Sequence, residues 1–599
     1  MPQNARSFWK MLLSGALKPG VLRRLRFTSF GLGDSSYPRY NVSHRMLCGR
    51  LTQLGAFSFC ERGEGNEQHP EGHSAGFREW IVQLKTGILD AFPLPDGVEP
   101  MGDAEFLEPK WKLAIDESPN GVEASNREAK VQDGESVERS DQPCDATLQP
   151  SLQSIKIEDS PSTKPIPIKD SYSADLVAND RMTAVDHFQD VRLLDIRLDR
   201  QYAYNPGAVA VIYPKNFPSD VEEFIKLMRW EDIADTPITI SPTRPMIPGQ
   251  ATTPSPLRHL DLSTTQLTLR WLLENVIDIM SIPRRSFFAN LAYFAGTSTE
   301  DEEYQKERLL ELANPELIDE LWDYTTRPKR TILEVMMDFT TIQIPWQYAL
   351  SALPLLRGRQ FSIASGGDLK HSPDSDGRTR VQLLVAIADP PSPIIKYRRR
   401  HGVCTRYIAT LQAGQKLNVG MQQGYLDVQP GEISQPVVLV GPGTGLAPMR
   451  AMAHQRLAWA RELNVREPGT RLQGDILFFG CRGRSADYFF QHEWEDIFRP
   501  EAMQVYTAFS RDKDAEAQQG GAKYVQHQIR KHAEAVFEAI HEREGRIYVC
   551  GSSGNMPKAV REAFVEVLVE QRGGKMSREN AEAYLDGMEK EGRYKQETW

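Results

Sequence analysis

A glycine-rich turn behind an apolar run is the first pattern in the chain that could do chemistry. The sequence VVLVGPGTGLAPMRAM fills residues 437–452 and places Gly441, Gly443, Thr444 and Gly445 between a predicted strand and a predicted helix. Glycines let the backbone approach a pyrophosphate, and the N-terminus of the helix attracts its negative charge. A turn without any ligand would also explain the glycines, but the order of strand, turn and helix favours a nucleotide site.

A second polar group follows another predicted strand and indicates which nucleotide is bound. Ser510 and Arg511 end this strand, and Lys523, Tyr524 and Gln526 follow after a short loop. A ribose 2′-phosphate requires cations and hydroxyl donors at this place, whereas NAD would favour a carboxylate. A solvated basic loop is the alternative for these residues alone. Together with the glycine-rich turn, they predict NADPH rather than NADH.

Two earlier segments carry the groups that a flavin dinucleotide needs. Residues 359–362 (RQFS) lie on a predicted strand. They offer the Arg359 guanidinium to bind a diphosphate, the Phe361 ring to stack on a flat cofactor ring, and the Ser362 hydroxyl beside it. Residues 402–405 (GVCT) open a turn toward a helix and offer backbone amides and a hydroxyl. Taken separately, each segment is more simply read as ordinary core or turn. Their order before the glycine-rich turn favours a FAD site.

Short strands must position the nucleotide groups. From residue 436 onward, four apolar runs (VVLV, DILFFGCRGR, MQVYTAFSR and RIYVCGSS) end at small or polar residues, as buried parallel strands do. A helix follows the glycine-rich turn and runs through Trp459. We therefore predict a doubly wound α/β domain over residues 436–599.

The middle of the chain predicts a β-domain that is interrupted by helices. Strands are expected at VRLLDIRL and AVAVIYP, then a mostly helical stretch covers about 218–345, and strands return at 359–365, 381–388 and 402–408. This split predicts one β-domain over residues 176–435 with a helical insertion.

The N-terminal part alternates helices and strands. Residues 1–112 contain predicted strands at 26–30 and 56–60 between helical segments, a βαβα order that is typical of an open parallel sheet. Residues 113–175 are rich in Ser, Asp, Glu, Asn and Pro and have almost no aromatic residues. This composition predicts a disordered linker.

Length and composition narrow the function classes. A chain of 599 residues should hold three or four domains. The net charge of −10 argues against a nucleic-acid or anionic-membrane partner, although an acidic face could steer a basic protein partner. The six cysteines form no C-x-x-C pair, so we expect no disulfide framework, no metal site and a reducing compartment. No stretch approaches the length of a membrane segment.

The motifs R-x-F-S, G-V-C-T, GPGTGLAP, FFGCRGRSADYFF, AFSR, YVQH and IYVCG occur in this order over roughly residues 180–599. The chain thereby resembles the diflavin reductases, in which a ferredoxin–NADP reductase module follows a flavodoxin domain. The segments PRRSFF, RTILEV and the terminal ETW are similar to the NADPH-dependent branch that serves cytosolic iron–sulfur protein assembly. Cytochrome P450 reductases are more distant, because they generally carry Tyr at the position of Phe361 and Asp at that of Glu597.

The resemblance implies an α/β multidomain fold: a partial flavodoxin-like parallel sheet, an antiparallel FAD-binding β-barrel with a helical insertion, and a doubly wound NADP-binding domain. It implies that Trp599 stacks on the isoalloxazine and moves aside for nicotinamide. The implied FAD contacts are Arg359, Gln360, Phe361, Ser362, Gly402, Val403, Cys404, Thr405 and Trp599. The implied NADPH contacts are Gly443, Thr444, Ser510, Arg511, Lys523, Tyr524 and Gln526. The implied catalytic residues along the hydride path are Ser362, Cys550, Glu597 and Trp599, where packing for Cys550 and solvation for Glu597 are the alternatives.

The flavodoxin part resembles its family in two FMN loops, with Tyr37 as the stacking ring. The implied FMN contacts are Leu32, Gly33, Asp34, Ser35, Ser36, Tyr37, Asn41, Asn66 and Glu67. Family members carry a phosphate loop, three strands and a second aromatic loop before the helix at which this sequence begins. Because the phosphate loop that would bind the FMN phosphate is absent from this sequence, we expect the chain as written to bind FAD but little FMN. Either translation starts further upstream, or the product has lost FMN.

The resemblance implies an enzyme that passes hydride from NADPH to FAD, and then single electrons through FMN to a redox protein. It implies that this acceptor is the iron–sulfur protein anamorsin, and that the enzyme works in the cytoplasm, with mitochondria as a further location. A P450-reductase-like electron donor is the alternative enzyme. A non-catalytic assembly factor is the alternative from another class, but such a scaffold would not need FAD and NADPH motifs together.

Overall fold

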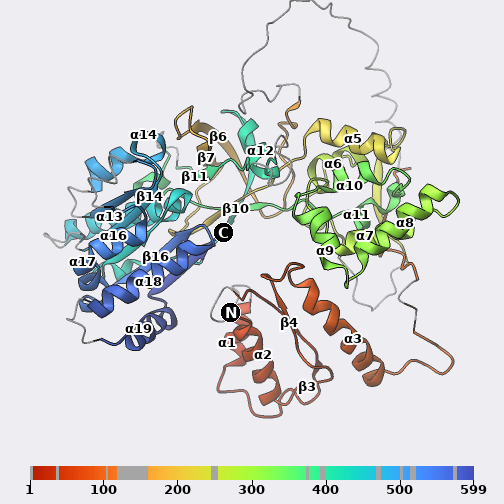
Figure 1. Cartoon of the computed structure of the whole chain (residues 1–599), viewed down its shortest axis with the longest axis horizontal. Helices are drawn as coiled ribbons and strands as arrows, with labels where there is room; N and C mark the ends of the chain where they lie inside the picture. The colour runs from red at the N-terminus through yellow and green to blue at the C-terminus, as the bar shows by residue number, and fades with distance from the viewer. Residues whose placement is uncertain are drawn as a thin grey trace, which may run out of the picture. The chain divides into compact units, whose positions relative to one another are not determined.

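The computed structural model of the chain, whose elements are labelled in Figure 1, divides into two compact units. The first comprises residues 1–109, 282–331 and 339–343, and the second comprises residues 110–281, 332–338 and 344–599. The structure describes residues 5–35, 40–100, 102, 105–117, 159–244, 254–372, 377–390, 400–466, 472, 474–498, 503–512, 521–570 and 576–599.

The N-terminal part of the first unit has short parallel strand pairs and three helices. β1 pairs in parallel with β3, and β2 pairs in parallel with β4. The prediction for 26–30 and 56–60 therefore found β1 and β3, but it missed β4, whose sequence GEGN contains no apolar side chain. The elements are α1 (Arg6–Leu12), β1 (Arg26–Phe27), β2 (Phe30–Gly33), α2 (Val42–Gln53), β3 (Phe57–Ser58), β4 (Gly63–Asn66) and α3 (Ser74–Ala91).

Apolar and capping residues hold the other helices of the first unit. Phe288 and Leu291 of α7 are fully buried, and the Thr299 hydroxyl accepts a hydrogen bond from the Glu302 amide at the start of α8. Four acidic residues fill the first turn of α8, where the helix dipole favours negative charge. The elements are α7 (Arg285–Leu291), η4 (Ala292–Phe294), α8 (Glu300–Ala313), α9 (Ile318–Leu321) and η5 (Trp322–Thr326).

Six antiparallel strands of the second unit form a nearly closed barrel. Their order is β10-β8-β12-β6-β7-β11, and a bridge between Ile363 and Leu383 brings the two end strands together. Alternating side chains such as Leu194 and Ile196 fill the interior. The predicted antiparallel barrel is thereby confirmed. Its strands are β6 (Tyr172–Arg181), β7 (Val191–Leu198), β8 (Val209–Ile212), β10 (Arg359–Ser362), β11 (Arg380–Ala386) and β12 (Lys416–Gln422).

The predicted helical insertion also contains a strand. β9 (Ile238–Pro242) pairs antiparallel with β5 (Trp111–Ile115). Within the stretch predicted as a linker, the structure describes residues 113–117 and 159–175; residues 118–158 lie outside the described residues. The domain limits stay predictions. The helices of the second unit in this region are α5 (Pro218–Met228), α6 (Leu269–Asn275), α10 (Ile332–Asp338), η6 (Trp346–Tyr348) and α11 (Ala349–Ala352).

A five-stranded parallel sheet completes the second unit, with strand order β15-β14-β13-β16-β17. Val437 and Leu439 pack with α13 on one face, and Val438 and Val440 pack with α16 and α18 on the other. This arrangement confirms the doubly wound sheet. Its strands are β13 (Val437–Val440), β14 (Ile476–Cys481), β15 (Gln504–Phe509), β16 (Arg546–Gly551) and β17 (Tyr594–Thr598). Two helices lie between barrel strands in the chain: η7 (Gly367–Lys370) and α12 (Val403–Thr410). The helices that come after the barrel are η8 (Pro430–Glu432), η9 (Gly443–Gly445), α13 (Leu446–Arg466), α14 (Arg484–Asp487), η10 (Glu493–Phe498), α16 (Val525–Lys531), α17 (Ala533–Phe537), η11 (Glu538–Glu542), α18 (Asn555–Glu570) and α19 (Arg578–Glu591).

Among the described residues, none of the helices combines the length and the apolar character that a membrane crossing requires.

Candidate nucleotide and flavin sites

The glycine-rich turn lies between β13 and α13 and packs closely on the end of β16. A Cβ atom on Gly445 would stand 2.1 Å from the backbone carbonyl oxygen of Cys550. Only a residue without a side chain allows this approach. Because the strands are parallel, the turn and Cys550 share the carboxyl edge of the sheet, where nucleotides bind in open α/β sheets.

Ser510 and Arg511 lie at the same edge of the sheet. The Ser510 amide donates to the Cys481 carbonyl (2.9 Å), and the Arg511 amide donates to the Arg482 carbonyl (2.8 Å). These two bonds continue the pairing of β15 with β14 beyond the end of β15, so the Ser510 and Arg511 backbones are held in place. Residues 513–520 of the following loop lie outside the described residues.

Lys523, Tyr524 and Gln526 surround the start of α16. Tyr524 is the residue before the helix, and its ring is 48% exposed. The Gln528 side chain donates to the Thr507 carbonyl of β15 (2.7 Å), which fixes α16 on the sheet. The predicted NADPH residues are therefore brought together from the ends of β13 and β15 and the beginning of α16.

The C-terminal strand brings Cys550, Glu597 and Trp599 together. β17 pairs in parallel with β16 so that Cys550 lies opposite Glu597. The Trp599 amide donates to the Gly551 carbonyl (3.1 Å), and the Trp599 carbonyl accepts from the Ser553 amide (2.8 Å). The Trp599 indole is 55% exposed although its backbone is held. Ser362, the fourth predicted catalytic residue, lies on β10 of the barrel.

Burial dominates the electrostatics of this edge. It raises the pKa of the Cys550 thiol well above its ordinary value, and the Glu597 carboxylate acts in the same direction. Burial also raises the pKa of Glu597, whose Oε2 atom is buried without a hydrogen-bond partner among the described residues. Burial therefore favours the protonated forms of both groups. A buried oxygen without a partner, such as Oε2, favours a ligand that forms a hydrogen bond with it.

The two predicted FAD segments lie close together on the barrel. Phe361 and Ser362 pair with Ala210 and Val209 of β8, which fixes the alternation of side chains along β10. Arg359 lies opposite Ile212 of β8, and Ile212 lines the same small hollow as Tyr407, which follows the turn at Gly402. Burial raises the pKa of the Cys404 thiol to about 12, and the positive charge of Arg359 partly opposes this rise.

Residues 402–408 form the beginning of α12 rather than a strand. The structure corrects the strand prediction for this segment, but it places the expected turn at Gly402, directly before the helix. The Thr405 hydroxyl accepts from the Ala388 amide (3.0 Å) and holds the start of the helix on the barrel. First-turn amides of a helix have no partner within it, so this turn and the nearby Arg359 fit an anionic diphosphate.

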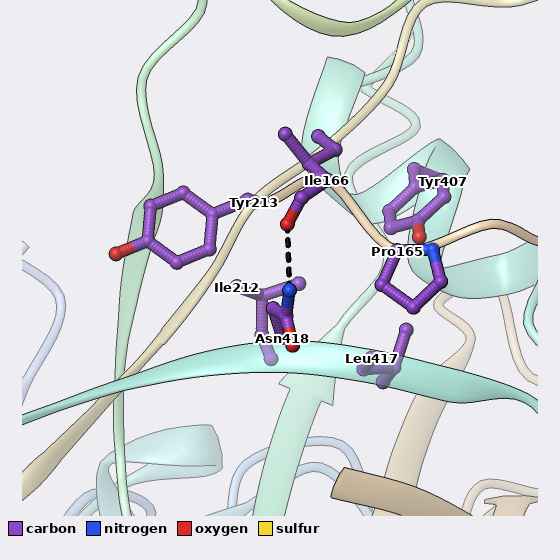
Figure 2. A pocket seen from close by; sticks show the side chains of 7 residues that line it. All are labelled: Pro165, Ile166, Ile212, Tyr213, Tyr407, Leu417 and Asn418. Atoms are coloured by element: carbon purple, nitrogen blue, oxygen red, sulfur yellow. Dashed lines mark hydrogen bonds between the residues drawn. The ribbon is translucent and has the colours of Figure 1, made fainter. Parts of the chain in front are cut away.

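A small surface hollow lies beside α12 (Figure 2). The rings of Tyr213 and Tyr407 flank it, and the Asn418 side chain donates to the Ile166 carbonyl (2.7 Å) across its floor. None of the predicted FAD residues lines it. The lining residues are Pro165, Ile166, Ile212, Tyr213, Tyr407, Leu417 and Asn418. We therefore place the FAD contacts outside this hollow.

The predicted FMN loops meet at the carboxyl ends of β2 and β4. The Asn66 side chain donates to the Ser35 hydroxyl (3.0 Å), and the Ser35 amide donates to Asn66 Oδ1 (3.0 Å). Glu67 pairs with His73 at 3.0 Å. Asn41 has a positive φ of 52° and donates from its side chain to the Gly65 carbonyl (3.2 Å).

The other predicted FMN residues have different surroundings. Leu32 and Gly33 end β2, and Leu32 is 72% exposed. Asp34 follows directly. Ser36 and Tyr37 lie outside the described residues. The structure thus brings the two loops side by side through Ser35 and Asn66.

Comparison with known proteins gives this geometry a family. Three family models match in order: flavodoxin over residues 1–80, FAD binding domain over 164–407 and oxidoreductase NAD-binding domain over 439–562. NADPH-dependent diflavin oxidoreductase 1 of Aspergillus fumigatus is 42% identical over 605 residues, with 100% of this chain and 88% of that protein covered. The chain belongs to the NADPH-dependent diflavin oxidoreductases.

Further relatives agree with this assignment. The protein of the same name from Emericella nidulans is 42% identical with the same coverage, and that of Xenopus laevis is 33% identical over 100% of this chain and 89% of its own length. The predicted resemblance, the enzyme class and the cofactor set of FAD, NADPH and FMN are confirmed. The expectation that the chain as written binds little FMN stays a prediction. This diflavin oxidoreductase has FAD-binding and NAD-binding domains and a flavodoxin domain, which is the type that binds FMN.

Sequence reasoning missed two features near the candidate site of this diflavin oxidoreductase. The pairing of β17 with β16 was not predicted, because YKQET has only one apolar side chain and gives no strand signal. The ion pair of Arg450 with Glu493 was also missed, because the two residues lie 43 positions apart. The only signal was a charged residue in the otherwise apolar run after the glycine-rich turn.

Replacement of Glu597 by Gln should change how the stability of this diflavin oxidoreductase depends on pH. A carboxyl with a raised folded pKa binds its proton more tightly in the folded chain than in the unfolded one. The free energy of unfolding of the wild type should therefore fall as pH rises from the ordinary value of 4.5 through the raised pKa. Glu597→Gln should lack this loss in urea unfolding between about pH 4.5 and 8.

The exposed Glu579 in the first turn of α19 provides the control for this measurement. Glu579→Gln should keep the pH dependence of the wild type. An identical slope in Glu597→Gln and wild type would show that the Glu597 carboxyl is solvated.

Proposed function

We propose that this diflavin oxidoreductase moves a hydride from NADPH to FAD and passes the electrons through FMN to the iron–sulfur protein anamorsin in the cytoplasm. The observation that carries the hydride step is the shared sheet edge, where the glycine-rich turn touches Cys550 and Cys550 lies opposite Glu597. The flavins supply the chemistry of accepting a hydride and releasing single electrons. The similarity of PRRSFF, RTILEV and ETW to the iron–sulfur assembly branch supports anamorsin as the acceptor.

The protein residues bind and orient the nucleotides. The turn at Gly443 and Thr444 and the N-terminus of α13 face the pyrophosphate of NADPH, and the cations Arg511 and Lys523 bind its 2′-phosphate. Ser510, Tyr524 and Gln526 complete this binding site. For FAD, Arg359 and the first turn of α12 bind the diphosphate, Phe361 supports the flat ring, and Gln360 and Ser362 border it.

The buried groups at the sheet edge keep protons and exclude water. The Cys550 thiol and the Glu597 carboxyl both favour their protonated forms because they are buried. The Trp599 ring would cover the flavin and would have to move aside for nicotinamide. The loops around Ser35 and Asn66 would hold FMN, which supplies single-electron transfer when bound.

Rapid mixing of the FAD-loaded protein with NADPH under anaerobic conditions tests the hydride step. Loss of flavin absorbance with NADPH, and a much slower loss with NADH, is the expected result. A purified protein without flavin absorbance after incubation with FAD would contradict it. Anamorsin and a cytochrome P450 serve as competing acceptors in a second mixing experiment, and faster reduction of the P450 would overturn the choice of acceptor.

Deletion of Trp599 should relax the selectivity for NADPH. Nicotinamide must displace the indole, and an aromatic stack is worth about 0.5–1.5 kcal/mol. NADH lacks the 2′-phosphate contacts and is limited by affinity, so it should gain more from the deletion than NADPH. We expect the ratio of NADH to NADPH turnover to rise roughly 2- to 10-fold in steady-state assays.

Trp599→Phe is the matched control for the deletion, because it keeps an aromatic ring at the held backbone position. This variant should stay close to the wild-type ratio. An unchanged ratio in the deletion variant, with an intact flavin spectrum, would show that the indole does not cover the flavin.

A further inference from the structure

A buried arginine connects the helix of the NADPH site to the barrel. Arg450 lies in the first turns of α13 and is 3% exposed. Its Nε and Nη2 donate to Oε2 and Oε1 of Glu493 at 2.7 and 2.6 Å. Its Nη1 donates to the Ala364 carbonyl (2.8 Å) and to the Gln382 side chain (2.9 Å), both on the barrel. One guanidinium therefore contacts both halves of the second unit.

The barrel segment held by Arg450 directly follows the predicted FAD strand. Ala364 comes two residues after Ser362. The residues that follow Ala364 pack closely against α13. A Cβ atom on Gly366 would stand 1.9 Å from the Ala451 carbonyl oxygen of this helix. The Gly367 amide donates to the Gln455 side chain of the same helix (3.2 Å). This segment is therefore fixed to α13 at three successive places.

The partners of Arg450 fix the orientation of its guanidinium. Burial would raise the pKa of Glu493, but hydrogen bonds from Arg450 and His454 lower it to about 2. The guanidinium also lies 4.1 Å from the centre of the Phe490 ring. A bidentate arginine–carboxylate pair fixes direction as well as distance. Buried ion pairs often add little to the net free energy of folding. We therefore look for the role of this pair in the geometry that it fixes.

We propose that Arg450 is a positioning residue for hydride transfer, which sets the distance between the flavin and the nicotinamide. The inference rests on the proposed function. α13 begins at the turn assigned to NADPH, and the Ala364 segment continues the strand assigned to FAD, so Arg450 links the helix of one site to the strand of the other. Hydride transfer requires reacting atoms about 3–3.5 Å apart, and a shift of about 1 Å can cost on the order of 100-fold in rate.

Arg450→Lys and Gln382→Leu test this role in the full-length, FAD-loaded protein. Arg450→Lys keeps the charge but loses the fork, and Gln382→Leu removes one barrel acceptor while the pair with Glu493 stays intact. The rate of FAD reduction at saturating NADPH should fall on the order of 10- to 100-fold in Arg450→Lys and less in Gln382→Leu. The dissociation constant of NADPH and the FAD content should stay at wild-type values.

Arg456→Lys is the matched control. Arg456 lies on the same helix, is 1% exposed and donates from Nε and Nη2 to Asp475 at 2.8 and 2.9 Å. Its other bonds go to carbonyls of residues 432–435, so it does not hold the segment after β10. Arg456→Lys should lose thermal stability but reduce FAD at the wild-type rate.

The primary deuterium isotope effect separates positioning from general loosening. With NADPH deuterated at the transferred position, the isotope effect should increase in Arg450→Lys, because hydride transfer becomes more rate-limiting. Wild-type rates in both Arg450→Lys and Gln382→Leu, or an equal loss in Arg456→Lys, would overturn the proposal. If Arg450→Lys does not bind FAD, Gln382→Leu decides the question. Failure of the proposed function is distinguishable, because the wild type itself would then leave its FAD oxidised with NADPH.

Discussion

Gly445→Ala is expected to slow the reduction of FAD by NADPH on the order of 100-fold. The added methyl group would stand 2.1 Å from the Cys550 carbonyl oxygen, a backbone atom that cannot turn away as a side chain can. The turn and the end of β16 must therefore separate. This separation moves the nucleotide away from Cys550 and from Glu597, which is paired with it. Overpacking should also destabilise the fold by about 1–3 kcal/mol.

Gly554→Ala provides the control for Gly445→Ala. Gly554 directly precedes α18, three residues after the end of β16, and no atom lies within 4 Å of the position of its Cβ. Stopped-flow measurement of flavin absorbance at saturating NADPH should show the slow rate only in Gly445→Ala. A wild-type rate in Gly445→Ala would mean that the turn relaxes without moving the nucleotide.

Arg511→Ala should weaken NADPH binding by roughly 10- to 150-fold, the equivalent of about 1.5–3 kcal/mol for a lost charge-assisted hydrogen bond. Its backbone is fixed by the bond to Arg482, so the substitution removes the cation and leaves the edge of the sheet in place. NADH has no 2′-phosphate, and its affinity should stay nearly constant.

Titration of both nucleotides in rapid-reaction experiments measures this difference. Arg578→Ala is the control, because Arg578 is an exposed arginine of the same sheet domain that pairs with Glu562 and Glu582 on the helices. It should bind both nucleotides like the wild type. Equal losses for NADPH and NADH in Arg511→Ala would remove Arg511 from the 2′-phosphate site.

The buried strands of the parallel sheet could be predicted because their side chains are apolar on both faces. Val437–Val440 is buried at every position, and a continuous apolar run of this kind is typical of a central parallel strand. β17 lies at the edge of the same sheet and is mostly polar. β6 was missed for a related reason, since its polar residues begin within a stretch that resembles a linker in composition.

The segment 402–408 shows how tertiary packing overrides local preference. Val403, Thr405 and Ile408 are β-branched, which favours a strand. In α12 the buried side chains are Cys404, Tyr407 and Ile408, a spacing of three and four residues that faces the barrel core. The helical period was present in the sequence, but it covers too few residues to outweigh the β-branched ones.

The residue types of the candidate site could be predicted, whereas their contacts could not. The glycines, the arginine after β15 and the terminal tryptophan follow from the needs of a phosphate and a flat ring. The position of Cys550 opposite Glu597 depends on the pairing of β16 with β17, two strands separated by α18 and α19. Sequence spacing does not determine such long-range pairing.

The strand order of the barrel has a consequence for its biogenesis. β12 lies between β6 and β8, yet the ribosome synthesises it long after both. At about 5–20 residues per second, the interval between β8 and β12 is on the order of 10–40 s. During this time the inner edges of β6 and β8 lack their partner, and unpaired strand edges promote aggregation. Chaperone binding to the nascent chain should therefore be strongest in this interval, before FAD can bind to the barrel and stabilise it.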